Sequence, residues 1–364
     1  MTCDNGYSPR LIALEVTRTC YMHCRHCRAG ATNERYNDEF SSEEIFKVLD
    51  NIASFAEPII ILTGGEPMLR GDIYDIASYG TQHGLTMVMA PCGFLITNET
   101  IEKMKKAGIK RISLSLDGAR RETHDNFRQV KGSFDGVLKA ADLAGRGGLE
   151  FQINTTVHRQ NMDELPKILE LAVGLGAKAF HPFLLVPTGR AKNLVDQEIT
   201  PEEYEQILNW IYEQRETVPI HFKPTCAPHY YRVCIQRERE RKETASHSLH
   251  RFDRMSKGCM GGQSFAFISH TGKVYICGFL EKEAGDLRDE DYDFRKIWDS
   301  SPLFLNIRDI DRYGGKCGYC EYRQVCGGCR ARAYALTGDC LAEEPFCVYT
   351  PNIPVKDREA KHGK

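Results

Sequence analysis

Short apolar, β-rich runs alternate with amphipathic helical segments from residue 11 to residue 186. Helices are expected after the capping sequence SSEE at Ser41, after Asn98, near Asp135 and from Asn161. Such alternation implies parallel strands joined by right-handed crossovers, and so predicts an α/β barrel or partial barrel. The expected strands are 11–16, 58–62, 85–90, 111–116, 150–157 and 177–186.

The segments that follow these strands carry the residues suited to chemistry. A cysteine triplet follows the first strand, TGGEP the second, PCG the third, DGARR the fourth and PTGR the sixth. In parallel α/β folds the carboxyl ends of the strands meet on one face, and active sites form there. We therefore expect these segments to converge on one site.

The triplet consists of Cys20, Cys24 and Cys27. A closed structural zinc site usually takes four ligands, so three thiols without a fourth beside them indicate a metal centre with one open position. The alternatives are a zinc site and a buried cysteine cluster without metal. The chain has 15 cysteines in all and no secretory signal, which favours metal ligands over disulfides.

A second set of cysteines lies beyond residue 225. A zinc ribbon built from two C-x-x-C pairs is the alternative to a larger metal centre. However, the gap between the pairs is short for a ribbon, and the cysteines exceed what one zinc needs. Lone cysteines at 3, 92 and 340 are expected to be ordinary thiols. The second set, beyond residue 225, comprises Cys226, Cys234, Cys259, Cys277, Cys317, Cys320, Cys326, Cys329 and Cys347.

Composition gives no indication of a nucleic-acid or membrane partner. The 364 residues are 41% hydrophobic and 27% charged, with a formal net charge of −2. The first residues lack the apolar core of a targeting segment, so a cytoplasmic protein is expected. We expect a barrel domain over 1–225, a cysteine-rich domain over 226–350 and a polar tail over 351–364.

The pattern C-x-x-x-C-x-x-C after the first strand, with GGEP after the second, resembles the radical S-adenosylmethionine (SAM) enzymes. The resemblance implies a partial (β/α)6 barrel and a four-iron four-sulfur cluster held by Cys20, Cys24 and Cys27. The fourth iron then binds the amino and carboxylate groups of SAM, which is cleaved to a 5′-deoxyadenosyl radical. Thiolates suit such clusters, and an open site is where a substrate can be activated.

The resemblance also implies roles for residues around SAM. His26 would lie near the adenine, although a surface histidine is as good an interpretation. Arg128 would bind the SAM carboxylate, the alternative being a solvated helix face. The methionine amino group would be bound by Gly64, Gly65, Glu66 and Pro67, the ribose or carboxylate by Ser115, and the adenosine by Asn154, which is expected to end the fifth strand.

The later cysteines resemble the SPASM extension of radical SAM enzymes, which implies one or two auxiliary four-iron clusters. One would be bound by Cys317, Cys320, Cys326 and Cys347, and the other by Cys259, Cys277 and Cys329. Cys226, Cys234 or an open position would complete the latter. The chain departs from the family in the C-x-x-C spacing at Cys326 and in lacking a cysteine just before Cys259.

Four segments, LIALEVTRTC, FHPFLLVPTGRAKNL, TCAPHYYR and SFAFISHTGKVYICGFLE, support a further resemblance. Through them nearly the whole chain resembles the haem synthases of the sirohaem-derived pathway. This resemblance implies oxidative decarboxylation of two propionates of iron-coproporphyrin III to vinyl groups, with ferredoxin or flavodoxin as electron donor. The alternatives are another sirohaem-derived tetrapyrrole as substrate, a peptide-modifying or sulfatase-maturing SPASM enzyme, and a non-catalytic metal scaffold.

The charge run RERERK (237–242) is expected to be a solvated helix rather than a propionate clamp. Candidate propionate partners are Arg120, Arg121, Arg190, Lys192, Arg254 and Lys257, with His229, Tyr230 and Tyr231 bordering an apolar slot.

Overall fold

The computed structural model describes residues 6–242 and 258–352. Its strands form one sheet in the order β10-β9-β8-β1-β2-β3-β4-β5-β6-β7. Because β10 and β7 are not paired with each other, the sheet stays open. The strands are β1 Leu11–Thr17, β2 Ile59–Gly64, β3 Thr86–Met89, β4 Arg111–Ser115, β5 Glu150–Val157, β6 Ala179–Leu184, β7 His221–Phe222, β8 Phe265–Ile268, β9 Lys273–Tyr275 and β10 Glu283–Asp286.

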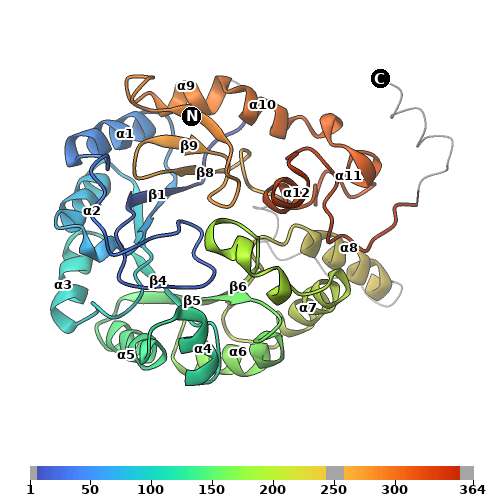
Figure 1. Cartoon of the computed structure of the whole chain (residues 1–364), viewed down its shortest axis with the longest axis horizontal. Helices are drawn as coiled ribbons and strands as arrows, with labels where there is room; N and C mark the ends of the chain where they lie inside the picture. Colours follow the sequence, from blue (N-terminus) through green and yellow to red (C-terminus); the bar gives the residue numbers. More distant parts are fainter. Residues whose placement is uncertain (1–5, 243–257, 353–364) are drawn as a thin grey trace.

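The first six strands are parallel and adjacent in chain order, which confirms the expected partial barrel. Helices cover its outer face, as Figure 1 shows for α1 to α6. The helices are α1 Ser42–Phe55, α2 Ile73–Gln82, α3 Asn98–Lys106, α4 Arg121–Arg128, α5 Ser133–Arg146, α6 Leu165–Gly174, α7 Pro201–Gln214, α8 His229–Lys242, α9 Phe294–Ser300, α10 Pro302–Arg308, α11 Gly315–Tyr319 and α12 Arg330–Thr337.

Local sequence explains where these elements begin. The capping box expected at the start of α1 forms, with the Ser41 side chain accepting from the Glu44 amide and the Glu44 side chain accepting from the Ser41 amide. The helix expected from Asn161 begins later, at Leu165, and is preceded by a 3-10 turn. The reason is that the buried Asn161 side chain donates to two backbone carbonyls, those of Asp117 and Thr156, which holds it in the loop.

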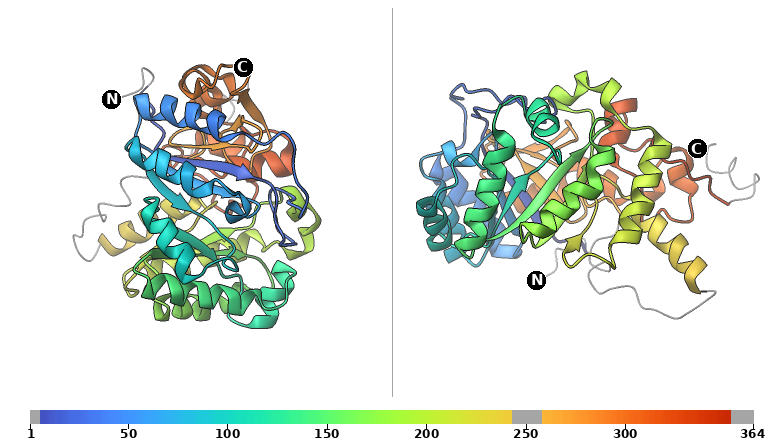
Figure 2. Two further views of the ribbon diagram at one scale, coloured as in Figure 1. Left: turned by 90° about the vertical axis from the view of Figure 1, so that its left-hand side faces the viewer. Right: turned by 90° about the horizontal axis from the view of Figure 1, so that it is seen from below.

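The sheet extends beyond the barrel strands on both sides. β7 pairs with β6, and β8 pairs in parallel with β1, in the register Leu11 to Phe265. β9 and β10 continue the sheet as antiparallel neighbours. The orange strands of Figure 2 therefore lie beside the blue β1, although the chain separates them widely. The boundary expected between a barrel domain ending at residue 225 and a cysteine-rich domain beginning at residue 226 stays a prediction.

The core of the sheet is built from alternating side chains. In β5, every second residue from Phe151 to Val157 is buried, as the pleat of a strand requires. RERERK lies on α8, as expected, and Arg237 and Arg241 pair there with glutamates of the preceding helix and loop. Within the described part of the chain, no helix is long and apolar enough to cross a membrane.

Candidate functional site

The cysteine triplet lies in the loop that follows β1. Cys20 and Cys24 are buried, and Cys27 is half-buried. The Met22 amide donates to Cys20 Sγ at 3.4 Å. Burial, together with the charge of Glu66 and the neighbouring thiols, raises the pKa of Cys20 to about 12. The Cys20 thiol is therefore protonated without a metal, and binding one would release its proton.

The loop is fastened by Arg190, one of the predicted propionate partners. Its Nε donates to Cys24 O at 2.9 Å and its Nη1 to Ala31 O at 2.8 Å. The Arg190 amide donates to Cys27 O at 3.0 Å. The structure thus places Arg190 as a support of the cysteine loop, a role for which the sequence offered no signal.

The GGEP segment packs directly against this loop. A Cβ atom on Gly64 would lie 2.2 Å from Thr17 O, and one on Gly65 would lie 2.4 Å from Thr19 O. No other residue fits either position without moving backbone. Close approach was expected at these glycines, and the neighbour that they approach is the protein's own chain.

Glu66 is fully buried behind the loop. One of its carboxylate oxygens accepts from the Met68 amide at 2.9 Å and the other from the Cys92 amide at 2.7 Å. Pro67 follows it as the first residue of a 3-10 turn. Burial raises the pKa of Glu66 although these hydrogen bonds oppose it. The carboxylate is held rigidly beside Cys20.

Arg128 is not on a solvated face. Its Nε donates to Asp117 Oδ2 at 2.5 Å, and its Nη1 donates to Cys24 Sγ at 3.6 Å. Asp117 lies just after β4 and is fully buried, which raises its pKa, but the Arg128 charge together with its other neighbours outweighs burial and lowers it. The guanidinium therefore lies at the cysteine triplet, as expected for a residue that binds there.

His26 stacks in a column of rings. Its ring lies 4.2 Å from that of Phe127, which lies 3.9 Å from that of His158. Burial and the nearby Arg128 lower the pKa of His26 to about 3, so the imidazole is neutral. His26 is half-buried and stacked rather than free on the surface, and Phe127 is a neighbour of the triplet that the sequence reasoning missed.

Ser115 and Asn154 are partners in the register between β4 and β5. Ser115 lies on β4, as expected, and is its last residue. Asn154 does not end its strand, because β5 continues to Val157, where pairing with β6 is still intact. Gln152 Nε2 donates to Asn154 Oδ1 at 3.0 Å. Both side chains lie toward the carboxyl edge of the barrel.

Four of the later cysteines line one cavity. Cys317, Cys320, Cys326 and Cys347 face it together with the basic residues Arg232, Lys316 and Arg323. The pKa of Cys326 is raised by burial and further by the charges of Cys347 and Cys317. These are the four residues that the sequence assigned to one cluster, and a shared cavity lined by thiols and cations fits an anionic iron–sulfur group.

A second group gathers around Cys226. Burial raises the pKa of Cys226, and the charges of Cys329, Cys277 and Cys259 raise it further, which shows that these thiols are neighbours. Cys226 has a φ of 58°, a left-handed conformation rare outside glycine. Cys234 instead accepts a hydrogen bond from Arg215 at 3.4 Å. Of the two candidates for the fourth position, the structure brings Cys226 to the group.

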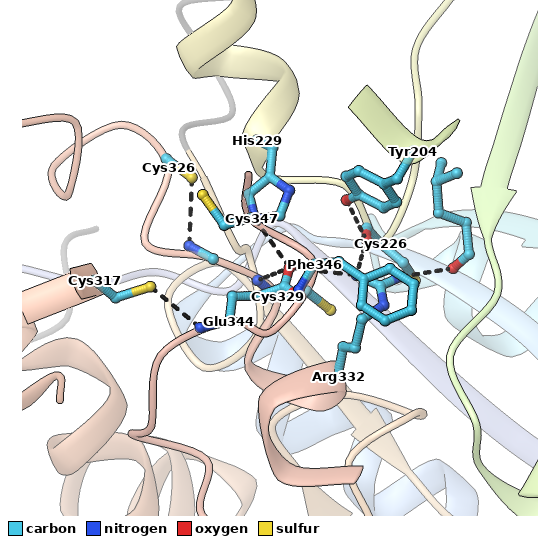
Figure 3. Close-up of polar contacts among 12 residues, drawn as sticks. Tyr204, Cys226, His229, Cys317, Cys326, Cys329, Arg332, Glu344, Phe346 and Cys347 are labelled. Carbon is cyan, nitrogen blue, oxygen red and sulfur yellow. Dashed lines mark hydrogen bonds and ion pairs between the residues drawn. The ribbon is translucent and has the colours of Figure 1, made fainter. Parts of the chain in front are cut away.

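A buried ionic network lies between the two groups (Figure 3). Arg332 donates to Cys226 O, Leu184 O and Leu185 O, and its Nη1 lies 3.4 Å from Glu344 Oε2. His229 Nε2 lies 3.0 Å from the same oxygen. His229 thus belongs to the network and also lines the cavity of Cys317, Cys320, Cys326 and Cys347. The sequence reasoning missed Arg332 and Glu344, for which the only signal was RAR directly after Cys329.

The remaining predicted propionate partners are engaged within the protein or fall outside the described residues. Arg254 and Lys257 lie outside the described residues. Tyr230 is buried in the core, and Tyr231 is half-buried. Three of the other cations form ion pairs with acidic side chains: Arg120 with Glu164, Arg121 with Asp135 and Lys192 with Glu281.

Among the described residues no group of three His, Cys, Asp or Glu side chains closes on a single metal ion.

Sequence comparison places this site among known families. The Radical SAM superfamily profile matches residues 14–172, and that of SPASM, an iron-sulfur cluster-binding domain, matches residues 259–330. An AdoMet-dependent heme synthase of Nitratidesulfovibrio vulgaris is 48% identical over 96% of this chain and 94% of the relative. One of Methanosarcina barkeri is 46% identical over 94% of this chain and 97% of the relative.

Solved structures share the fold. Streptococcus suis SuiB bound to its precursor peptide SuiA superposes with a TM-score of 0.74 at 17% identity, covering 94% of this chain and 76% of that one. The enzyme anSMEcpe with bound AdoMet superposes with a TM-score of 0.66 at 17% identity, covering 93% and 94%. The comparisons confirm an enzyme that uses SAM and iron–sulfur clusters. The chain belongs to the radical SAM superfamily, carries a SPASM domain, and is a member of the AdoMet-dependent heme synthase family.

Proposed function

We propose that this enzyme converts iron-coproporphyrin III to haem b by oxidative decarboxylation of two propionate arms to vinyl groups. The observation that carries the proposal is the joint presence of an open three-thiol site at the barrel mouth and two further four-thiol groups. The relatives named AdoMet-dependent heme synthase support the class of product. A relative of Methanosarcina barkeri that is 29% identical is named Fe-coproporphyrin III synthase, which favours a tetrapyrrole of this kind as substrate.

The ligand sets follow from the thiol groups. Cys20, Cys24 and Cys27 would hold the cluster that binds SAM, and the donor set fits because three thiols leave one position open. Cys317, Cys320, Cys326 and Cys347 would hold one auxiliary cluster. Cys226, Cys259, Cys277 and Cys329 would hold the other. When bound, these groups and SAM supply a carbon radical that removes hydrogen and an acceptor for one electron.

The residues around the triplet would position SAM. Arg128 carries the charge that suits a carboxylate, and Asp117 fixes the plane of its guanidinium. The His26 ring, held by Phe127, offers a flat neutral face beside the triplet for the adenine. Glu66 would accept from the methionine amino group with the lone pairs that its two backbone partners leave over.

At each propionate arm, the loss of one hydrogen atom, one carbon dioxide and one electron gives the vinyl group. Hydrogen is removed from the β-carbon of the propionate, and the carboxylate departs as carbon dioxide. The vinyl group forms when one electron passes to an acceptor. The barrel mouth must hold the β-carbon close and exclude water, because a radical quenched by solvent gives no product. A low-potential ferredoxin or flavodoxin would supply the electron that starts each cycle.

Anaerobic incubation with SAM, dithionite and iron-coproporphyrin III tests the function. Mass analysis should show a tetrapyrrole that has lost two carboxyl groups, with one SAM consumed for each. A variant with Cys20, Cys24 and Cys27 all replaced by alanine should form neither product nor 5′-deoxyadenosine. Consumed SAM beside an unchanged iron-coproporphyrin III would refute the proposed substrate while leaving the family assignment intact.

A further inference from the structure

Arg330 is a buried cation in contact with one predicted ligand. It directly follows Cys329, begins α12, and has no exposed surface. Its Nη2 donates to Cys317 Sγ at 3.6 Å. Its other hydrogen bonds go to the carbonyl oxygens of Gly328, Cys340 and Ala342, at 3.4, 3.2 and 2.7 Å. Tyr313 presents its ring to the guanidinium at 4.5 Å.

The charge of Arg330 is balanced differently from those of the arginines near the other thiols. Arg128 pairs with Asp117, and Arg332 pairs with Glu344. For Arg330, no ion pair with a carboxylate forms within the described parts of the chain. The acid that acts on it most closely, Glu344, already faces Arg332 and His229. A buried charge without a counter-charge is costly, so an anionic cluster beside Cys317 would stabilise it beyond what its carbonyl and ring partners provide.

Hydrogen bonds to sulfur gather at the same group. Cys317 accepts from Arg330 and from the Glu344 amide, Cys320 from the Tyr322 amide, and Cys326 from the Gly328 amide. In the Cys226 group, among described residues, only Cys277 accepts such a bond, from the Phe279 amide. In the triplet, Cys20 accepts from the Met22 amide and Cys24 from Arg128.

Both features act in one direction on a cluster. A positive charge and N–H donors at the sulfurs stabilise the more negative, reduced state, and so raise the reduction potential. The Cys317 group has the unshared buried cation and the most N–H donors, whereas each of the other groups has an arginine paired with a carboxylate. The electrostatic environment therefore differs between the two auxiliary groups.

We propose that Arg330 raises the reduction potential of the cluster held by Cys317, Cys320, Cys326 and Cys347, making it the final electron acceptor within the enzyme. This inference rests on the proposed function. One electron from each decarboxylated arm is taken up there as a one-electron reduction, and a soluble one-electron carrier protein then removes it. Arg330 is a positioning and tuning residue, because it touches a ligand and not the substrate.

A redox titration of the reconstituted enzyme, monitored by electron paramagnetic resonance and without tetrapyrrole, tests this role. In R330Q the ratio of reduced to oxidised Cys317 cluster at fixed potential should fall at least tenfold, about 59 mV for one electron. R330K keeps the charge and should retain most of the wild-type potential. The potential of the triplet cluster in the same samples should not change and serves as the internal control.

Several outcomes would overturn the proposal. These are an unchanged potential in R330Q with full iron content, or an equal fall in R330K and R330Q, which would indicate a packing role. If R330Q fails to hold the cluster, the reduction potentials of the wild-type clusters still test the proposal. With signals assigned by C277A and by a triplet alanine variant, the Cys317 cluster must have the highest potential of the three. Because no tetrapyrrole is present, failure here is separate from failure of the proposed reaction.

Discussion

Arg128 and Asp117 form a buried ion pair at the mouth of the barrel, with Nε and Oδ2 2.5 Å apart. Asp117 also accepts from the Thr156 amide at 2.7 Å, so the carboxylate joins α4 to the end of β5. The same guanidinium reaches Cys24 Sγ. The pair therefore connects the helix, the sheet and the cysteine triplet, and fixes the direction of the one cation that contacts a triplet thiol among the described residues.

Asp117→Asn should destabilise the protein strongly. The substitution leaves the Arg128 charge buried without its partner, and breaking a buried pair costs about 3–5 kcal/mol. Thermal unfolding should show a large fall in Tm. Arg121→Gln is the matched control, because the Arg121–Asp135 pair is exposed and such pairs contribute about 0–1 kcal/mol. Equal effects of the two substitutions would contradict the importance of the buried pair.

Gly65→Ala should displace the cysteine loop. The added methyl would lie 2.4 Å from Thr19 O, 2.6 Å from Arg18 O and 2.7 Å from Cys20 Cβ, and two of these are backbone atoms that cannot turn aside. Iron and sulfide analysis should show the loss of about one four-iron cluster. Gly71→Ala is the control, since nothing lies within 4 Å of its Cβ position. Full cluster content in Gly65→Ala would show that the loop can shift without losing its metal.

The barrel could be predicted from the chain because each strand and helix carries its own local pattern. The alternation along β5 and the capping box at Ser41 are both properties of neighbouring residues. The pairing of β8 with β1 has no such signal, because β8 is a short apolar run and its partner lies some 250 residues away. A long-range pairing depends on what the intervening chain leaves uncovered.

The same limit applies to the site. The resemblance to the SPASM extension implied which thiols would group, and the shared cavity of Cys317 and Cys347 agrees with it. Charge partners were not predictable. Arg128 could be expected to bind or to be solvated, and only the fold shows it beside Asp117. Likewise, the pairing of Arg332 with Glu344 depends on how the last segment folds back over α12.

Glu15→Gln should remove part of the pH dependence of stability. Glu15 is buried in β1 and contacts Arg28, Arg18 and His270. Its pKa is lowered because these neighbours outweigh the burial that would raise it. A lowered folded-state pKa gives stability that is present above the unfolded value of about 4.3 and lost as pH falls below it.

The Tm difference between wild type and Glu15→Gln should therefore be large at pH 7, persist down to about pH 4.3, and shrink only as the pH falls below that value. Comparing the two proteins at each pH cancels the acid lability of the clusters that they share. Glu150→Gln is the control, because its pair with Arg111 is exposed and its removal should change Tm little at any pH. A Tm difference that stays constant with pH would show that Glu15 is not ionised in the folded state.

Cys226→Ser and Cys234→Ser form the most direct comparison of the two candidates for the fourth ligand. Cys226 is surrounded by the charges of Cys329, Cys277 and Cys259, whereas Cys234 contacts Arg215. Serine nearly preserves the size of the thiol but binds iron poorly, since clusters are held by thiolates. Cys226→Ser should therefore lose or weaken one auxiliary cluster, seen as a changed electron paramagnetic resonance signal and up to about four fewer irons. Cys234→Ser should match the wild type, and the reverse result would move the fourth ligand to Cys234.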